Sequence, residues 1–244
     1  MTKRLFLEMM LEILYPRRCP LCRETVGQKG EKICPACKRS LRPIREPACK
    51  KCGKPLNRQE QEYCADCGRE EHLYTRGLAV LPYEGAVRRS MGQIKFHNKR
   101  EYLDFYGPYM AEILGQRILS WKVQAIAPVP MHPAKKRRRG FNQAELLAEK
   151  LGECLGIPVM PGLVERVRAT RPQKELTRRE RQNNLKGAFK IRGYDVKLKK
   201  IILVDDIYTT GSTVDAIAGE LLRQGAEEVY FASLCIGRDD SEIL

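Results

Sequence analysis

Eight of the ten cysteines form four Cys-x-x-Cys pairs near the N-terminus, and the pairs repeat along the chain with an offset of 30 residues. Each Cys-x-x-Cys turn presents two thiolates, and two such turns can complete a tetrahedral four-sulfur zinc site. The repeat therefore predicts a duplicated unit with two structural zinc ions, which we interpret as a double zinc ribbon over residues 15–72. The predicted ligands are Cys19, Cys22, Cys34, Cys37, Cys49, Cys52, Cys64 and Cys67.

The surrounding sequence disfavours other uses of these cysteines. Disulfide bonds are typical of exported proteins, but Glu8 and Glu12 interrupt the apolar N-terminal stretch and no small-residue cleavage site follows. We therefore expect residues 1–14 to form an amphipathic helix in a cytoplasmic protein that has no membrane span. A thioredoxin-like redox pair lacks its βαβ context here. The pairing of ligands stays open, because contiguous and interleaved arrangements use the same residues.

Residues 76–244 show a different pattern, in which apolar strand-like runs alternate with amphipathic helical runs. Strands are predicted at GLAVLPY, VQAIAPVP, KKIILVDDI and EVYFASLCI, and helices at NQAELLAEKLGECLG and STVDAIAGELLRQGA, among others. Strands that alternate with helices form a parallel sheet covered on both faces, so we predict an α/β domain. The two unpaired cysteines, Cys154 and Cys235, are predicted to be core thiols.

The run IILVDDIYTTGSTV combines a buried-looking strand with two acidic residues and a hydroxyl-rich loop that opens a helix. Parallel sheets bind ligands at the carboxyl ends of their strands, where a glycine loop and a helix N-terminus attract phosphate. Neighbouring carboxylates can accept hydrogen bonds from vicinal hydroxyls or hold Mg²⁺. The combination indicates a ribose 5-phosphate derivative. The predicted binding residues are Asp205, Asp206, Thr209, Thr210, Gly211, Ser212 and Thr213.

This run resembles the phosphoribosyl pyrophosphate (PRPP) motif of type I phosphoribosyltransferases without a gap from Ile201 to Thr213. The resemblance implies that the acidic pair holds the ribose hydroxyls and magnesium and that the loop holds the 5-phosphate. A side chain at Gly211 is then expected to intrude where the loop backbone meets the phosphate. Thr209 stands where purine-salvage enzymes have an acidic residue, so a hypoxanthine–guanine type of base mechanism is not expected. His97 and His132 are candidate bases by chemistry alone.

Two cationic segments are candidates for handling the diphosphate of PRPP. The first lies between a predicted strand and helix and comprises Lys135, Lys136, Arg137, Arg138 and Arg139, which we interpret as a pyrophosphate loop. A nucleic-acid patch or a localisation signal is the rival interpretation. The second segment, RVRATRPQKELTRRERQNNLKGAF, suits a mobile loop that closes over the ligand. A net charge of +15 on 244 residues favours a polyanionic partner, which can be nucleic acid, a nucleotide, pyrophosphate or an acidic protein, and the charge does not choose among them.

The cysteine repeat taken together with PVPMH, RRRGFNQAELLA, LTRRERQNNLKGAF and ILVDDIYTTGST resembles the ComF family over nearly the whole chain. The resemblance implies a double zinc ribbon fused to a phosphoribosyltransferase domain that acts in DNA uptake during natural transformation. Two uses of the site remain open. One is a phosphoribosyltransferase with an unidentified acceptor. The other is a non-catalytic module that senses PRPP or a nucleotide and contacts single-stranded DNA or a helicase partner.

Overall fold

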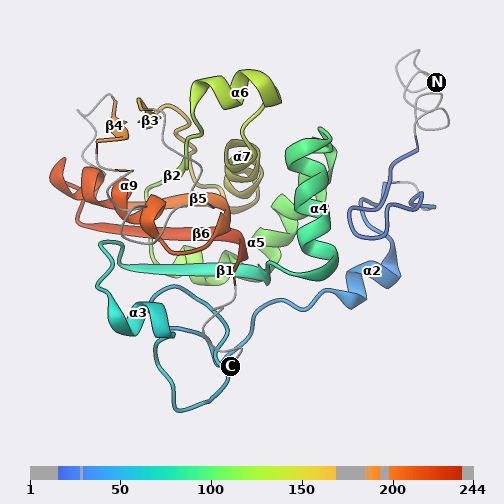
Figure 1. Ribbon diagram of the computed structural model, residues 1–244, viewed down its shortest axis with the longest axis horizontal. Coiled ribbons are helices and arrows are strands. Elements are labelled where there is room, and N and C mark those ends of the chain that lie inside the picture. The colour runs from blue at the N-terminus through green and yellow to red at the C-terminus, as the bar shows by residue number, and fades with distance from the viewer. Residues whose placement is uncertain (1–15, 28–29, 169–184, 186, 193–197, 238–244) are drawn as a thin grey trace.

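The computed structural model describes residues 16–27, 30–168, 185, 187–192 and 198–237, and its centre is a parallel sheet (Figure 1). Its four strands are all parallel and lie in the order β1, β6, β5, β2. An antiparallel pair, β3 and β4, forms a separate small sheet. The bounds are β1 Arg76–Pro82, β2 Ala125–Pro128, β3 Val164–Arg166, β4 Phe189–Ile191, β5 Lys200–Tyr208 and β6 Glu228–Ile236.

Helices connect the parallel strands, as the alternating pattern predicts, so the α/β prediction is confirmed. Glycine ends α7 at Gly156, which adopts the left-handed conformation that side chains disfavour. No helix within the described ranges combines the length and apolarity needed to cross a membrane. The helices are α2 Pro35–Ser40, α3 Ala65–Arg69, α4 Gly85–Phe96, the 3-10 helix η1 Arg100–Tyr102, α5 Leu103–Ser120, α6 Pro133–Arg139, α7 Gln143–Leu155 and α9 Ser212–Arg223.

Alternating residues of the central strands divide the core into two layers. In β5, Ile202 and Val204 pack with α4, α5 and α7, whereas Ile201 and Leu203 pack with α9 on the opposite face. This alternation follows from the two-residue period of a strand, and both faces are covered because both residue sets are apolar. The sheet is therefore a rigid support for whatever lies at the ends of its strands.

The two cysteine-rich units pack against different faces of this sheet. Cys19 and Leu21 belong to the layer of α4 and α5, while Cys49 and Cys52 belong to the layer of α9. Figure 1 shows α2 of the first unit beside α4 and α3 of the second unit below β1. The chain between the units follows the edge strand, where Ile44 donates its backbone N–H to the Val80 carbonyl at 2.9 Å. The ribbons therefore cover an edge that would otherwise be open.

The structure corrects two expectations about local structure. The cationic segment 135–139 lies in a short helix rather than a loop, because Pro133 begins α6, His132 caps it and Gly140 ends it in the left-handed region. Cys235 is a core thiol as predicted, but Cys154 is exposed, because it lies on the outer side of the amphipathic helix α7. The predicted helix over residues 1–14 lies outside the described residues.

Candidate functional site

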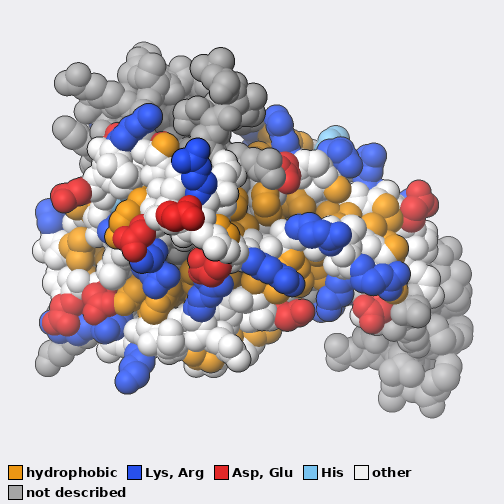
Figure 2. Space-filling model, turned by 90° about the horizontal axis from the view of Figure 1, so that it is seen from below, with side chains coloured by type: hydrophobic (Ala, Val, Ile, Leu, Met, Phe, Trp, Pro, Cys, Tyr) orange, Lys and Arg blue, Asp and Glu red, His pale blue; other side chains and the backbone are white. Residues whose placement is uncertain are grey.

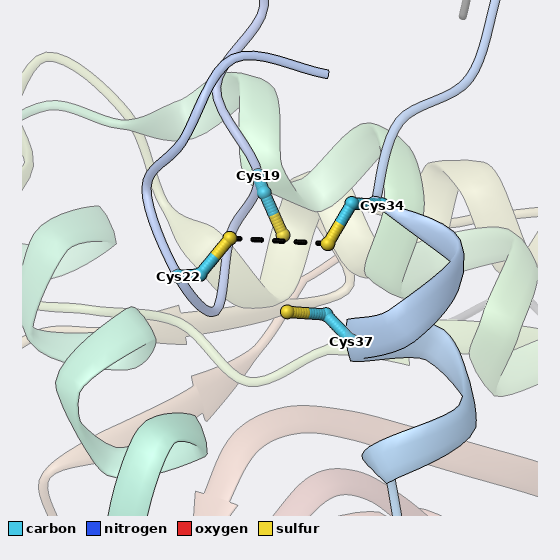
Figure 3. A group of neighbouring side chains, drawn as sticks. All are labelled: Cys19, Cys22, Cys34 and Cys37. Atoms are coloured by element: carbon cyan, nitrogen blue, oxygen red, sulfur yellow. Dashed lines mark hydrogen bonds between the residues drawn. The ribbon is translucent and has the colours of Figure 1, made fainter. Parts of the chain in front are cut away.

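The paired cysteines form two clusters, and in each the four sulfur atoms lie within 4.8 Å of one another. The first four cysteines make one cluster, drawn in Figure 3, and the last four make the other, so the contiguous pairing is correct. Cys22 and Cys34 sulfurs are 3.8 Å apart, and Cys52 and Cys64 sulfurs are 3.7 Å apart. Sulfurs placed about 2.3 Å from a tetrahedral zinc ion would be about 3.8 Å apart, so both donor sets fit zinc.

The internal duplication extends to the backbone of the two units. The amide of Arg23 donates to the Cys19 carbonyl at 2.9 Å, and the amide of Gly53, 30 residues later, donates to Cys49 at 2.8 Å. Both residues have positive φ, 69° and 77°. Burial raises the pKa of the Cys19 thiol, but neighbouring backbone N–H groups overcome this effect and lower it to about 7. The backbone of the first turn therefore favours the thiolate form of Cys19, the form that binds metal.

A cleft of about 500 Å³ lies where the carboxyl ends of β2 and β5 meet. From β2 the chain continues outward through α7 to residue 158, whose carbonyl accepts from the Ile126 amide at 2.9 Å. From β5 it continues through α9 to β6, on the other side of the sheet. Because the two connections diverge, the cleft lies at a topological switch point, the usual ligand position of such sheets. Charged side chains lining it are Lys95, Lys135, Arg138, Arg139, Arg166, Asp205 and Asp206.

The adjacent carboxylates point toward different neighbours because successive strand residues face opposite sides of the sheet. Asp206 pairs with Lys95 of α4, with 2.6 Å between Oδ2 and Nζ. Burial first, and then the charge of Asp206, raise the pKa of Asp205 well above its ordinary range. Burial lowers the pKa of Lys95, but the two carboxylates outweigh that effect and raise it. A cation bound between the carboxylates would relieve their repulsion.

Opposite the carboxylates, the cationic side chains of the cleft repel one another. Burial first, and then the charges of Arg166, Arg139 and Arg138, lower the pKa of Lys135. Burial also lowers the pKa of Arg166, although the nearby Asp205 opposes this shift. A multiply charged anion would relieve both the repulsion and the cost of burying these cations. The cleft is therefore suited to a ligand that carries phosphate groups and a divalent cation.

The loop 209–213 forms the wall of the cleft beside α9, a helix of twelve residues. Gly211 is the N-cap of α9 with φ of 81°, so the first-turn N–H groups of α9 open toward the loop. Helix N-termini of this kind attract anions. A Cβ at Gly211 would lie 2.6 Å from Tyr208 Oη and 2.9 Å from His72 Cε1. The expectation that a side chain there meets the phosphate is corrected: it collides with protein atoms first.

The cleft brings most of the sequence-predicted residues together but separates some of them. Thr209, Gly211, Ser212 and Thr213 line it, and Thr210 contacts Ser212 through its hydroxyl at 3.0 Å. Lys136 and Arg137 line a different cavity of about 560 Å³ on the other side of α6. This separation follows from the helical geometry of α6. The predicted closing loop lies mainly outside the described residues.

Neither candidate histidine lines the cleft. His132 accepts a hydrogen bond from the Ala134 amide at 3.2 Å as the cap of α6, and His97 lies in a groove beside the first ribbon. The predicted site residues leave out several residues that line the cleft, among them Lys95, Phe96, Asn142 and Gln143, while Arg166, which also lines it, is the first residue of the predicted closing segment. In the structure Phe96 is the last residue of α4 and is 72% exposed. An aromatic residue at this position is the one feature of the α4 sequence that could have pointed to the cleft.

Comparison with known proteins follows the same division of the chain. Residues 10–68 match the model of a double zinc ribbon domain. Residues 137–242 match the model of a phosphoribosyl transferase domain. The second match contains the acidic pair, the 209–213 loop and the end of α6 from Arg137 onward.

Among curated relatives, Competence protein F of Haemophilus influenzae is 40% identical over 43% of this chain and 47% of its own length. The DNA utilization protein YhgH of Salmonella typhi is 35% identical over 66% of this chain and 72% of its own length. Competence protein ComFC of Bacillus subtilis is 27% identical over 64% of this chain and 62% of its own length. The chain thus spans about half of the first of these relatives and a larger share of the other two.

Proposed function

This chain belongs to the ComF family, which joins a double zinc ribbon to a phosphoribosyltransferase domain, and on that premise we propose that it binds PRPP in the cleft between β2 and β5. The observation that carries the proposal is the composition of that cleft. It combines an acidic pair, a glycine loop at a helix N-terminus and five cationic side chains. PRPP offers a matching group to each of these parts.

The loop 209–213 receives the 5-phosphate, because the N-terminus of α9 and the hydroxyls of Ser212 and Thr213 supply donors there. Asp205 and Asp206 accept hydrogen bonds from the ribose hydroxyls. Lys135, Arg138 and Arg139 are assigned to the diphosphate, with Arg166 at the same wall of the cleft. Lys136 and Arg137, which line the separate cavity, are left with no role in holding the diphosphate.

The acidic pair also suits Mg²⁺, which takes oxygen ligands and commonly binds through one or two carboxylates together with substrate phosphates. Burial first, and then the charge of Asp206, raise the pKa of Asp205, and this unfavourable negative charge is the local evidence for the fit. When bound, Mg²⁺ would neutralise charge on the diphosphate and on the carboxylates. The pairing of Asp206 with Lys95 keeps one of these carboxylates oriented.

We assign transferase chemistry to the cleft. The acceptor forms a bond to C1 of the ribose, the bond between C1 and the diphosphate oxygen breaks, and pyrophosphate leaves with the bonding electron pair. Cationic side chains that surround the leaving group stabilise its charge and cost little reorganisation, because they are already clustered before the reaction. The acceptor is not identified by any residue of the cleft.

We also propose that the protein acts in DNA uptake. The relatives are named as competence and DNA utilization proteins, and a net charge of +15 supports contact with single-stranded DNA. The face seen in Figure 2 carries basic side chains interspersed with acidic and apolar ones. This face lacks a uniform basic surface, so the proposal of DNA contact rests on the net charge and on the names of the relatives.

Calorimetric titration with PRPP and Mg²⁺ tests the binding proposal, and pyrophosphate release in the presence of candidate acceptors tests turnover. We expect saturable binding to one site per chain, and release of pyrophosphate once the correct acceptor is present. A folded, zinc-loaded protein that does not bind PRPP would show the proposal to be wrong.

A further inference from the structure

The end of the second ribbon and the residues directly after it contact the 209–213 loop and the start of α9 through buried polar side chains. His72 is buried, and its Nδ1 lies 2.5 Å from Asp215 Oδ2 in the first turn of α9. The neighbouring Leu73 amide donates to Asp215 Oδ1 at 2.9 Å. Both carboxylate oxygens of Asp215 are thus used to attach this segment to the helix that the loop begins.

A second contact lies at the other end of the loop. Tyr74 is fully buried, and its Oη lies 2.8 Å from Tyr208 Oη. Tyr208 is the last residue of β5 and directly precedes the loop, and its ring stacks on Phe231 with centroids 4.5 Å apart. His72 stacks on Tyr74 at 4.9 Å, so the two contacts form one unit. We call His72, Tyr74, Tyr208 and Asp215 the ribbon–loop bridge.

The backbone of the loop rests directly on this bridge. The space that a side chain would need at Gly211 is filled by Tyr208 Oη and by His72. Glycine is therefore required there both for its positive φ and for the close approach of the bridge. A shift of His72 or Tyr208 by a few tenths of an ångström would move the loop wall that faces the cleft.

The bridge is also joined to the second cysteine cluster. Lys51, which lies between Cys49 and Cys52, places its ammonium 5.3 Å from the centroid of the Tyr74 ring. Its carbonyl accepts from the Gly77 amide at 2.7 Å, which attaches the same turn to the edge strand β1. Tyr74 and Tyr208 share a hydrophobic cluster with Cys49 and Cys52. The geometry of the metal turn is therefore transmitted to the bridge by direct packing.

The first cysteine cluster offers a comparison within the same molecule. It packs on the opposite face, against η1 and α5. Within the described part of the chain its hydrophobic cluster contains neither Tyr208 nor Val214, the two residues that flank the 209–213 loop and that belong to the cluster of the second ribbon. The duplicated units thus have similar metal turns but different neighbours. A difference in their effect on the loop would follow from position and not from metal chemistry.

We propose that the second zinc ribbon is a positioning element for the phosphate-binding loop and acts on it through His72 and Tyr74. The proposal rests on the assignment of PRPP to this cleft and adds a role for one of the two ribbons. Binding of a phosphate ester then depends on the second metal site, while the first site contributes to the fold alone. Preorganisation of the loop is the physical reason, because a loop that must be ordered on binding lowers the affinity.

A matched pair of variants tests this role. Tyr74→Phe removes the hydroxyl that contacts Tyr208, and Tyr106→Phe removes an equally buried hydroxyl that donates to Ser90 Oγ at 2.9 Å on the opposite face. We expect similar losses of thermal stability, but only Tyr74→Phe should weaken PRPP binding, by roughly threefold to tenfold. His72→Leu should weaken it further, and His72→Asn, which keeps a donor for Asp215, should recover part of the affinity.

Hydrogen exchange of residues 209–214 in the ligand-free variants separates this inference from the assignment of PRPP. Faster exchange in Tyr74→Phe than in Tyr106→Phe supports the bridge, even if the parent protein proves not to bind PRPP. Equal exchange in the two variants overturns the inference. If the parent protein binds PRPP, equal PRPP affinity of the two variants overturns it as well. Zinc content is measured in every variant, because retained zinc shows that the bridge and not the metal was altered.

Discussion

Replacing Asp205 and Asp206 one at a time by asparagine should change stability in opposite directions and weaken ligand binding in both cases. The carboxylate of Asp205 is disfavoured in the folded protein, because burial and the charge of Asp206 raise its pKa. Asp205→Asn removes that unfavourable charge and should raise the melting temperature of the ligand-free protein. Asp206→Asn instead leaves the ammonium of Lys95 without its partner at 2.6 Å, so it should lower the melting temperature.

The size of the second effect follows from how buried the pair is. Breaking a fully buried ion pair costs about 3–5 kcal/mol, but the side chains of Lys95 and Asp206 keep 21% and 13% of their exposure. We therefore expect Asp206→Asn to lower the free energy of unfolding by about 1–3 kcal/mol. Each kcal/mol corresponds to a fall of about 2–4 °C in melting temperature for a chain of this size. PRPP affinity should fall at least about tenfold in both variants, or about 1.4 kcal/mol, since a charge-assisted hydrogen bond is lost.

The pH dependence of the Asp205 effect has a defined sign. A carboxyl group whose pKa is raised on folding contributes stability below its ordinary pKa of about 4, and this contribution is lost as pH rises through the raised value. The stabilisation by Asp205→Asn should therefore be largest at neutral pH. It is measured by thermal unfolding in the presence of a metal chelator at concentrations that spare zinc. It should shrink as pH falls toward 4.

A double-mutant cycle with Lys95→Met checks the assignment of the destabilisation. The double variant Lys95→Met/Asp206→Asn should lose less free energy of unfolding than the two single variants lose together, because the two residues share one interaction. If the two asparagine variants lose stability equally, the electrostatic reasoning is wrong. If both are folded and bind PRPP as the parent does, the acidic pair has been assigned the wrong role.

Three further predictions concern the metal sites, the loop and DNA. Elemental analysis of protein purified without added metal should give two zinc ions per chain, and a value of zero or one in folded protein contradicts the two-site structure. Gly211→Ala should cost about 1–3 kcal/mol in thermal or urea unfolding, because the new Cβ meets Tyr208 and His72 at positive φ; unchanged stability would mean that the loop relaxes freely. Single-stranded DNA should bind without sequence preference and more weakly as salt rises, and a fluorescence titration at low salt that matches a neutral control protein would exclude this binding.

The sequence by itself determined the chemistry of the sites and the class of the fold. Cysteine spacing predicts two tetrahedral donor sets because a Cys-x-x-Cys turn is a local structure with its own geometry. Apolar runs with periods of two and 3.6 residues predict the strands and helices because side-chain direction is set by the local backbone. The order of strand, acidic pair and glycine loop predicts a phosphate site for the same reason, since its parts are adjacent in the chain.

Only the tertiary structure decided which distant residues complete these sites. Lys95 of α4 meets Asp206 of β5, although no local pattern distinguishes Lys95 from other surface cations. Arg166 of β3 lines the same cleft, whereas the sequence offered only the cationic segment that it begins. Lys135 and Lys136 are neighbours in the chain but line different cavities. The reason is the helical form of α6, in which adjacent residues point about 100° apart. Long-range packing sets these neighbours, and a single sequence carries little record of it.

The same division explains the two ribbons. Their sequences repeat every 30 residues and their metal turns share one backbone conformation, so the sequence presents them as equivalent. The fold makes them different, because the chain between them runs along the edge strand β1 and places them on opposite faces of the sheet. Among the described residues, the second ribbon and not the first contacts the wall of the 209–213 loop, through His72, because burial against α9 depends on where the sheet lies and not on the cysteines.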